Sequence, residues 1–252
     1  ITTKSGKEII TTKEHPYFIF EKKMKSIYAG ELKEDMLIAT PRIIHTKTNE
    51  ILLPEAEKII LQLKTNAKKI IFPEKVNSEL AEFLGYLTGD GHIDEHKIEF
   101  TNSDFDLRKR FSYLAQKLFS VSIREIKSRN TFNIQITSRV LNKAISGLFE
   151  IPFGKKADKV KIPSKILKSN NHILASFLKA YFDCDGYVPK NKRDIELATA
   201  SKIMSQQLQL ALLRFGVISF VKVKKINERN YYLIYIRGEF VNKFIKEIGF
   251  NQ

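Results

Sequence analysis

The feature that most constrains the fold of this chain is a short apolar stretch that occurs twice. The first copy is FLGYLTGDG at residues 83–91, and the second is LKAYFDCDG at residues 178–186. Both copies carry small residues four positions apart and end in Asp-Gly. An apolar run of this length is typical of a buried helix, and residues four apart share one helical face. We therefore expect two helices that pack closely against each other along their small residues.

Close packing of these helices would bring two acids together. Asp90 and Asp185 end the two copies, and each precedes a Gly that can leave the helical conformation. If the helices lie side by side, their carboxylates meet at one point, and such hard oxygen ligands suit Mg²⁺ or Mn²⁺. The duplicated motif thus predicts a metal site. The alternative reading of either copy alone is a core helix followed by an Asp-Gly turn.

The similarity between the two halves continues beyond the motif. Residues 98–101 (IEFT) correspond to 195–198 (IELA), residues 129–136 to 229–236, and residues 140–145 to 240–245. The spacing drifts from 97 to 100 residues, as short loop insertions would produce. A repeat that extends this far indicates two homologous halves within one chain.

Within each half, the periodicity predicts a mixture of helices and short strands. For the first half we expect a strand near 97–102, a helix near 105–119, a hairpin at 123–127 and 131–137, and a helix from Arg139. For the second half we expect a helix near 201–215 and strands at 221–225 and 231–237. The predicted fold class is α+β: two pseudosymmetric αββαββα repeats whose sheets form a concave saddle around the paired motif helices, preceded by a small β-rich segment.

The predicted hairpins carry hydrogen-bond donors on one face. A two-stranded β-ribbon fits the DNA major groove, where Arg and Lys suit guanine and Asn and Gln suit adenine. The alternative is the solvated outer face of an ordinary sheet. The candidate DNA-binding residues are Arg124, Lys127, Asn133, Gln135 and Thr137 in the first half and Lys222, Lys224, Tyr235 and Arg237 in the second.

The charge balance agrees with a polyanionic partner. The chain has 43 Lys and Arg against 28 Asp and Glu, a formal net charge of +15, and neutralising phosphates would release condensed counterions. A lysine-rich surface from an AT-rich or heat-adapted genome is the alternative. The single cysteine, Cys184, excludes an internal disulfide, and no apolar run is long enough to span a membrane. We therefore expect a cytoplasmic protein of a prokaryote, with archaea among the candidate hosts.

Residues 76–252, with their doubled motif and intact acids, resemble the single-chain, two-repeat LAGLIDADG homing endonucleases. The resemblance implies metal-dependent cleavage of double-stranded DNA at a long, roughly pseudopalindromic site. A monomer would cut one strand with each repeat and leave 3′ overhangs. Backbone groups of Gly89 and Cys184 would join Asp90 and Asp185 as ligands of Mg²⁺ or Mn²⁺. Lysines near the site assist catalysis in this family, and the matching regions here offer Lys155, Lys156 and Lys202.

The N-terminal part has a different pattern. Residues 8–12, 17–20 and 36–39 are short β-rich runs, and we expect a helix over residues 54–64, with a proline at its start. Thr12-Lys13-Glu14-His15 and residues 29–42 resemble parts of intein splicing domains. The family's initial Cys or Ser and terminal His-Asn pair are absent, so we expect no autonomous splicing. The expected division is a splicing-domain-like remnant and connector at 1–75, a first repeat at 76–150, and a linker with the second repeat at 151–252.

Two alternative functions fit the same sequence. A maturase or transcription regulator could use this scaffold to bind RNA or DNA without cutting it. A fragment of a protein-splicing intein is the other alternative. Both acids are present, which favours the endonuclease, because binding alone does not need two carboxylates beside phosphates.

Overall fold

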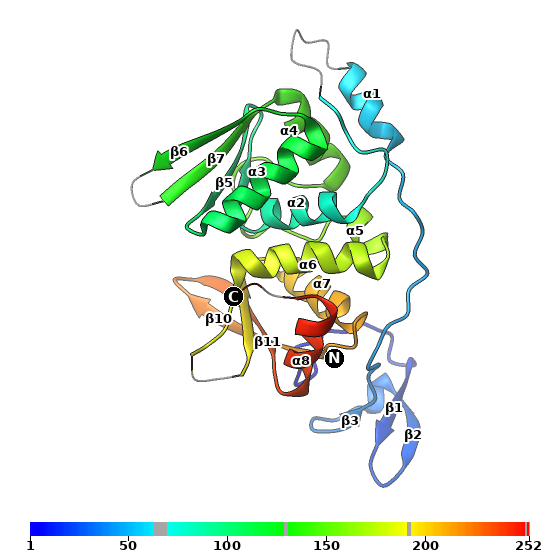
Figure 1. Ribbon diagram of the computed structural model, residues 1–252. Helices are drawn as coiled ribbons and strands as arrows, with labels where there is room; N and C mark the ends of the chain where they lie inside the picture. Colours follow the sequence, from blue (N-terminus) through cyan, green and yellow to red (C-terminus); the bar gives the residue numbers. More distant parts are fainter. Residues whose placement is uncertain (63–69, 129–130, 191–192, 250, 252) are drawn as a thin grey trace.

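Two motif helices lie side by side at the centre of the protein, with one half of the chain on either side of them (Figure 1). The computed structural model describes residues 1–62, 70–128, 131–190, 193–249 and 251. The first half contains α2 (Ser78–Thr88), β4 (Gly91–Ile93), β5 (Lys97–Asn102), α3 (Phe105–Phe119), β6 (Ile123–Ser128), β7 (Thr131–Thr137) and α4 (Arg139–Phe149). The second contains α6 (Asn171–Asp185), β8 (Gly186–Tyr187), β9 (Ile195–Thr199), α7 (Lys202–Leu213), β10 (Ser219–Ile226), β11 (Arg229–Ile236) and α8 (Glu239–Glu247), after the short α5 (Ser164–Lys168). The expected αββαββα order is confirmed in both halves.

Each half has a four-stranded antiparallel sheet with the same strand order. The orders are β4-β5-β7-β6 and β8-β9-β11-β10. In the first sheet, Ile136 pairs with Ile98 and Ile134 with Phe100, and all four side chains are buried. In the second, Ile234 and Ile236 pair with Leu197 and Ile195 in the same way. One face of each sheet therefore packs on helices, and both sheets lie toward the same side of the α2–α6 pair (Figure 1).

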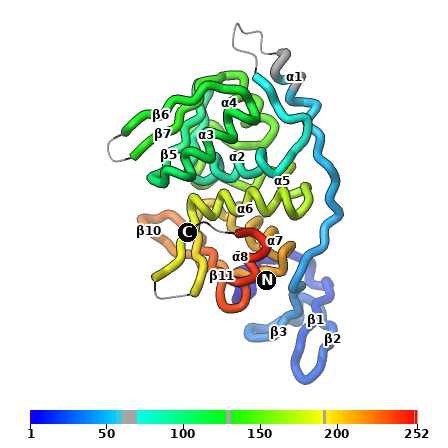
Figure 2. Tube along the Cα trace, in the orientation of Figure 1, coloured from blue at the N-terminus to red at the C-terminus, as the bar shows by residue number. Residues whose placement is uncertain are grey.

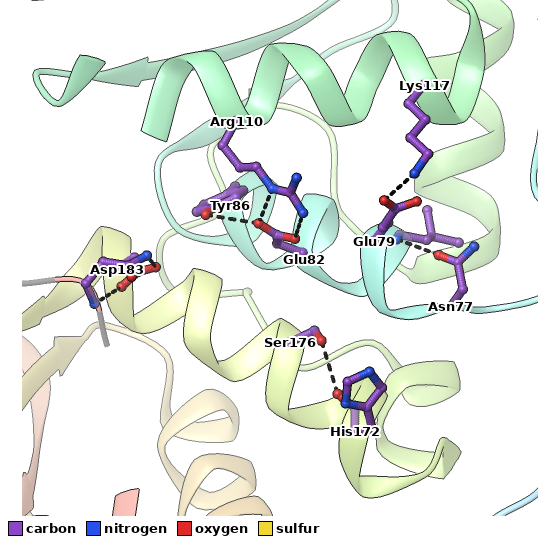
Figure 3. Close-up of polar contacts among 11 residues, drawn as sticks. Asn77, Glu79, Glu82, Tyr86, Arg110, Lys117, His172, Ser176 and Asp183 are labelled. Atoms are coloured by element: carbon purple, nitrogen blue, oxygen red, sulfur yellow. Dashed lines mark hydrogen bonds and ion pairs between the residues drawn. The ribbon is translucent and has the colours of Figure 1, made fainter. Parts of the chain in front are cut away.

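The core is continuous through both halves and the helix pair. Phe83 of α2 stacks on Phe111 of α3 with ring centroids 4.8 Å apart, and Phe111 stacks on Phe100 at 4.5 Å. Polar contacts reinforce the attachment of α2 to α3, as Figure 3 shows. Arg110 donates two hydrogen bonds, of 2.8 and 2.7 Å, to Glu82, the carboxylate that also accepts from Tyr86. The motif helix α2 is thereby held on its outer side, which leaves its small-residue face for α6.

The N-terminal segment forms a small sheet of its own. Its strands are β1 (Pro16–Phe20), β2 (Met24–Tyr28) and β3 (Leu37–Ile38), in the order β2-β1-β3. The expected strand at 8–12 was wrong, since Glu8 makes only an isolated bridge with Thr2. The structure adds β2, which lacks strong strand alternation in sequence but pairs with β1 along its whole length.

From this small sheet the chain runs along the outside of the molecule to α1 (Pro54–Gln62), as Figure 2 shows. Backbone hydrogen bonds are among the contacts that attach the segment to the second half. Val221 donates its amide to the Ser5 carbonyl at 2.9 Å, and Ile44 donates to the Leu213 carbonyl at 3.1 Å. The helix α1 begins at the predicted proline and contacts α4 of the first half.

The part of the chain that the structure describes contains no helix with the length and apolar character needed to span a membrane.

Candidate metal centre and nucleic-acid interface

The two motif helices touch at the small residues that the sequence singled out. A Cβ added to Gly85 would lie 2.5 Å from the Phe177 carbonyl oxygen and 2.8 Å from the Ala180 Cβ. A Cβ added to Gly89 would lie 2.6 Å from the Cys184 Cβ. These distances leave no room for larger side chains, so the helices approach each other along Gly85, Gly89, Ala180 and Cys184. The predicted close packing is confirmed.

This packing brings the two motif acids to one place. Asp90 follows Gly89, the C-cap of α2, and Asp185 is the last residue of α6. Burial and the nearby charge of Asp90 raise the pKa of Asp185 to about 6, against the opposing effects of a Tyr181 hydrogen bond and Lys156. Burial also raises the pKa of Asp90, whose Oδ2 accepts a 2.7 Å hydrogen bond from the Asn102 side-chain amide. Two partly buried carboxylates that repel each other are a favourable site for a cation.

A lysine from the basic linker reaches the same place. The Lys156 ammonium donates to the carbonyl oxygens of Leu87, of Thr88 at 2.7 Å and of Gly89 at 3.4 Å. These are carbonyls at the C-terminal end of α2, where the helix dipole favours positive charge. Burial lowers the pKa of Lys156 to about 8, although Asp185, Cys184 and Asp90 act to raise it. Of the three predicted lysines, Lys156 is the one that contacts the motif backbone.

The polar faces of the sheets contain most of the predicted DNA-binding residues. In the first sheet Arg124 pairs with Gln135 and Thr137 with Lys97, so these side chains share a face with Asn133. Lys127 pairs with Phe132 and therefore lies on the opposite face, which corrects its inclusion in the predicted set.

The second sheet places its predicted residues around one aromatic ring. Lys222 and Lys224 alternate along β10 and share the face of Tyr235. The Arg237 guanidinium lies 4.6 Å from the centre of the Tyr235 ring, and the Lys222 ammonium lies 5.9 Å from it. Arg237 also forms a 3.1 Å ion pair with Asp194. The face therefore presents cations positioned by an aromatic side chain.

Comparison with known proteins identifies the family. Residues 77–145 and 172–249 match the model of the LAGLIDADG-like domain, one segment in each half. This chain belongs to the LAGLIDADG-like family. Its fold is similar to that of I-DmoI in a complex with DNA and Mn, with a TM-score of 0.54 and 17% identity over 69% of this chain and 97% of that one.

Two curated relatives of this LAGLIDADG-like chain are much longer proteins. The chain is 40% identical, over its full length, to a segment of the replication factor C small subunit of Methanocaldococcus jannaschii. It is 31% identical, over 95% of its length, to a segment of an A-type ATP synthase protein of Pyrococcus abyssi. The matched segments cover 12% and 23% of those relatives, respectively.

The donor atoms of the LAGLIDADG-like centre fit a magnesium-type ion. The carboxylates of Asp90 and Asp185 and the carbonyl oxygens at the end of α2 are hard ligands, and Mg²⁺ usually keeps several waters beside one or two carboxylates. Among the described residues, no group of three or more His, Cys, Asp or Glu side chains could enclose a metal. Burial holds the pKa of the Cys184 thiol far above its usual range, so its backbone rather than its sulfur is the available donor.

The other two predicted lysines lie further out. Lys155 and Lys202 are exposed, and Lys202 forms a 2.6 Å ion pair with Glu8 of the N-terminal segment. Together with Lys156, they line a pocket of about 670 Å³ that Arg229 and Tyr232 also border. All three lysines thus border one pocket, where Lys156 contacts the backbone of α2 and Lys202 pairs with Glu8.

Two residues of this centre were not among the predicted site residues. Asn102 donates to Asp90, and Tyr181 hydrogen-bonds with Asp185. The signal for Tyr181 was its position four residues before Asp185 on the same helical face. The contact of Asn102 joins the end of β5 to the end of α2, a tertiary relation that local sequence does not contain.

Asp185→Asn is expected to stabilise the metal-free protein at neutral pH by about 1–2 kcal/mol. A carboxyl whose folded pKa is raised from 3.8 to about 6 destabilises the fold once it is ionised. This penalty is absent below the unfolded pKa and complete above the folded one, so the gain should appear as pH rises from about 4 to 7. Unfolding in urea with a chelator at several pH values measures it. An equal effect at pH 4 and pH 7 would contradict the electrostatic origin.

Proposed function

We propose that this chain is a site-specific, Mg²⁺- or Mn²⁺-dependent endonuclease of the homing type that cleaves double-stranded DNA as a monomer. The observation that carries the proposal is the pair of acids, one from each half, at the adjoining ends of two closely packed helices. Both sheets lie toward one side of that pair (Figure 1), and the net charge of +15 suits a polyanion. I-DmoI, which has the same fold, has been seen with DNA and Mn.

The residues of the centre have separable roles in this proposal. Asp90 and Asp185 would hold divalent metal, with carbonyl groups of Gly89 and Cys184 as further ligands. When bound, such a metal lowers the pKa of a coordinated water and stabilises charge on phosphate oxygens. Asn102 holds the Asp90 carboxylate through its 2.7 Å hydrogen bond. The two halves would each present one DNA strand to the centre, which gives staggered ends with 3′ overhangs.

The sheet faces would bind the duplex on either side of the centre. Because the two halves share one strand order, their target should be long and roughly pseudopalindromic. The proposed contact residues are Arg124, Asn133, Gln135, Thr137, Lys222, Lys224, Tyr235 and Arg237. Lys127 is left out because of its register.

Selection from a randomised duplex library tests the proposed function. The protein is incubated with the library in Ca²⁺, bound duplexes are recovered, and the recovered pool is then exposed to Mg²⁺ or to a chelator. We expect one long consensus site and cleavage in Mg²⁺ alone. Selective binding without cleavage in Mg²⁺ or Mn²⁺ would identify a cleavage-inactive DNA reader instead, and selection of no duplex would reject both and direct the test to RNA.

Lys156→Met is expected to slow cleavage by about 100-fold while changing duplex affinity by less than about threefold. Its ammonium lies among the carbonyls at the end of α2 and within electrostatic range of both acids, so its charge can act on the reacting phosphate. Single-turnover cleavage and binding in Ca²⁺ are measured separately. Lys155→Met is the matched control, since Lys155 is exposed beside it; equal losses in the two variants would reject the assignment to Lys156.

A second role is suggested by the comparisons. Segments similar to this chain lie within two longer relatives with unrelated names, a replication factor and an ATP synthase. We infer that this chain is an inserted element of the intein kind, with residues 1–75 as part of a splicing domain. His15, which packs edge-on against Tyr17 at 5.3 Å, donates its amide to the Thr12 carbonyl. Expressing the chain with its native flanking sequences tests this: ligated flanks support the role, and an intact, unprocessed precursor contradicts it.

A further inference from the structure

An acid occupies the middle of the polar face of the first sheet. Glu99 lies on β5, between β4 and β7, where it pairs with His92 on one side and Gln135 on the other. Its counterpart in the second sheet, Glu196, pairs with Tyr187 and Tyr235. A surface that only neutralised phosphates would gain nothing from acids at these central positions, because like charges repel. Their positions suit a partner that donates hydrogen bonds.

Glu99 is held by three donors on a single oxygen. Its Oε1 accepts from the Lys97 ammonium at 2.8 Å, the Asn133 amide at 3.0 Å and the Gln135 amide at 3.5 Å. No described residue donates to its Oε2, and this atom is not among the buried unpaired ones. The side chain is 19% exposed. Oε1 thus positions the group, and Oε2 remains an acceptor that is not buried and that no described residue occupies.

This arrangement also changes what the neighbouring amides can do. The side-chain nitrogens of Asn133 and Gln135 point to Glu99, and the Oδ1 atom of Asn133 is buried without a partner. Each amide nitrogen carries two protons, so one remains for DNA, but the buried Oδ1 of Asn133 cannot accept from adenine and complete a pair of hydrogen bonds with it. Both amides also orient the acid, and the cation of Lys97 offsets part of its charge.

Resting on the proposed function, we propose that Glu99 is a specificity-determining residue that accepts a hydrogen bond from the exocyclic amino group of a cytosine. An ionised carboxylate can only accept, and cytosine presents its N4 amino donor in the major groove, where Glu and Asp suit it. Guanine and thymine present acceptors there, which would face the carboxylate without a proton between them, and adenine places its N7 acceptor beside its N6 amino donor, so the carboxylate is repelled by one atom while it accepts from the other. Discrimination should act at one base pair in the half-site bound by the first repeat.

The specificity profile of matched variants tests this inference. Every base pair of the selected site is varied, and affinity in Ca²⁺ is measured for wild type, Glu99→Gln and Glu196→Gln. In Glu99→Gln we expect the preference for cytosine at one position to fall by about tenfold to 100-fold, with other positions unchanged. Glu196→Gln removes the same charge in the other half and should leave that position unaffected.

A second variant separates base contact from general charge. Glu99→Asp keeps the negative charge but draws the carboxylate back by one methylene, so it should also lose the preference for cytosine. If Glu99→Gln raises affinity equally for all sequences and neither variant alters the preference at any position, the inference is overturned while the proposed function stands. If the wild-type protein selects no duplex, both are overturned.

Discussion

Asp185→Asn is expected to lower the rate of double-strand cleavage by at least about 1,000-fold while leaving the affinity for the target duplex within about tenfold. Asn keeps the size of Asp, so the packed end of α6 should persist. The substitution removes one of the two negative charges that would hold the metal. Cleavage is measured at saturating protein in Mg²⁺, and binding is measured in Ca²⁺.

A nearby acid on the same helix provides the control for this effect. Asp183, two residues earlier, accepts hydrogen bonds of 2.8 and 2.7 Å from the backbone and side-chain amides of Asn251. It is buried, and these contacts, drawn in Figure 3, tie it to the C-terminal segment. Asp183→Asn should retain cleavage below its melting temperature. If both substitutions abolish cleavage in folded protein, the assignment of the metal-binding role to Asp185 is wrong.

Gly85→Val is expected to destabilise the protein by about 3 kcal/mol or more, the largest stability effect that we predict for a single substitution. Its Cβ would meet a backbone carbonyl of the partner helix at 2.5 Å, which cannot rotate away as a side chain could. The helices would have to separate, and the two acids would separate with them. Urea unfolding and cleavage at low temperature measure the two consequences.

Gly147→Ala serves as the matched control for helix glycines. Gly147 lies in α4, and the nearest atom to its added Cβ is the Ile59 Cδ1 at 3.9 Å. Because alanine favours a helix over glycine, this substitution should stabilise the protein by about 0.5–1 kcal/mol. A loss of stability at Gly147 as large as the loss at Gly85 would contradict the assignment of the Gly85 effect to the α2–α6 contact.

The sequence predicted the architecture well because the repeat supplied each observation twice. The strand at Lys97–Asn102 and the helix at Phe105–Phe119 have the predicted bounds, since both have clear periodicity and the helix starts at an Asp cap. The short strands β4 and β8 belong to the expected αββαββα order, but their positions were not predicted, because two or three residues carry no alternation. Both are held by pairing with β5 and β9, a tertiary effect.

The candidate site was predictable in its acids but not in its supporting contacts. Small residues four apart imply helix contact, and helix contact brings Asp90 and Asp185 together. The choice of Lys156 over Lys155 depends on the path of the linker, which local sequence does not determine. The misplacement of Lys127 has a related cause: in an exposed hairpin strand both faces are polar, so the sequence does not show which face a lysine takes.

Mapping the cut positions on both strands of the selected duplex tests the central claim most directly. Each strand is end-labelled in turn and incubated with one equivalent of protein and Mg²⁺. A single chain with one acid from each half should cut both strands, once each, at fixed positions that leave a 3′ overhang, and the Asp90→Asn/Asp185→Asn protein should cut neither. Cleavage of one strand only, or cuts that persist unchanged in the double variant, would contradict a shared centre built from the two motif helices.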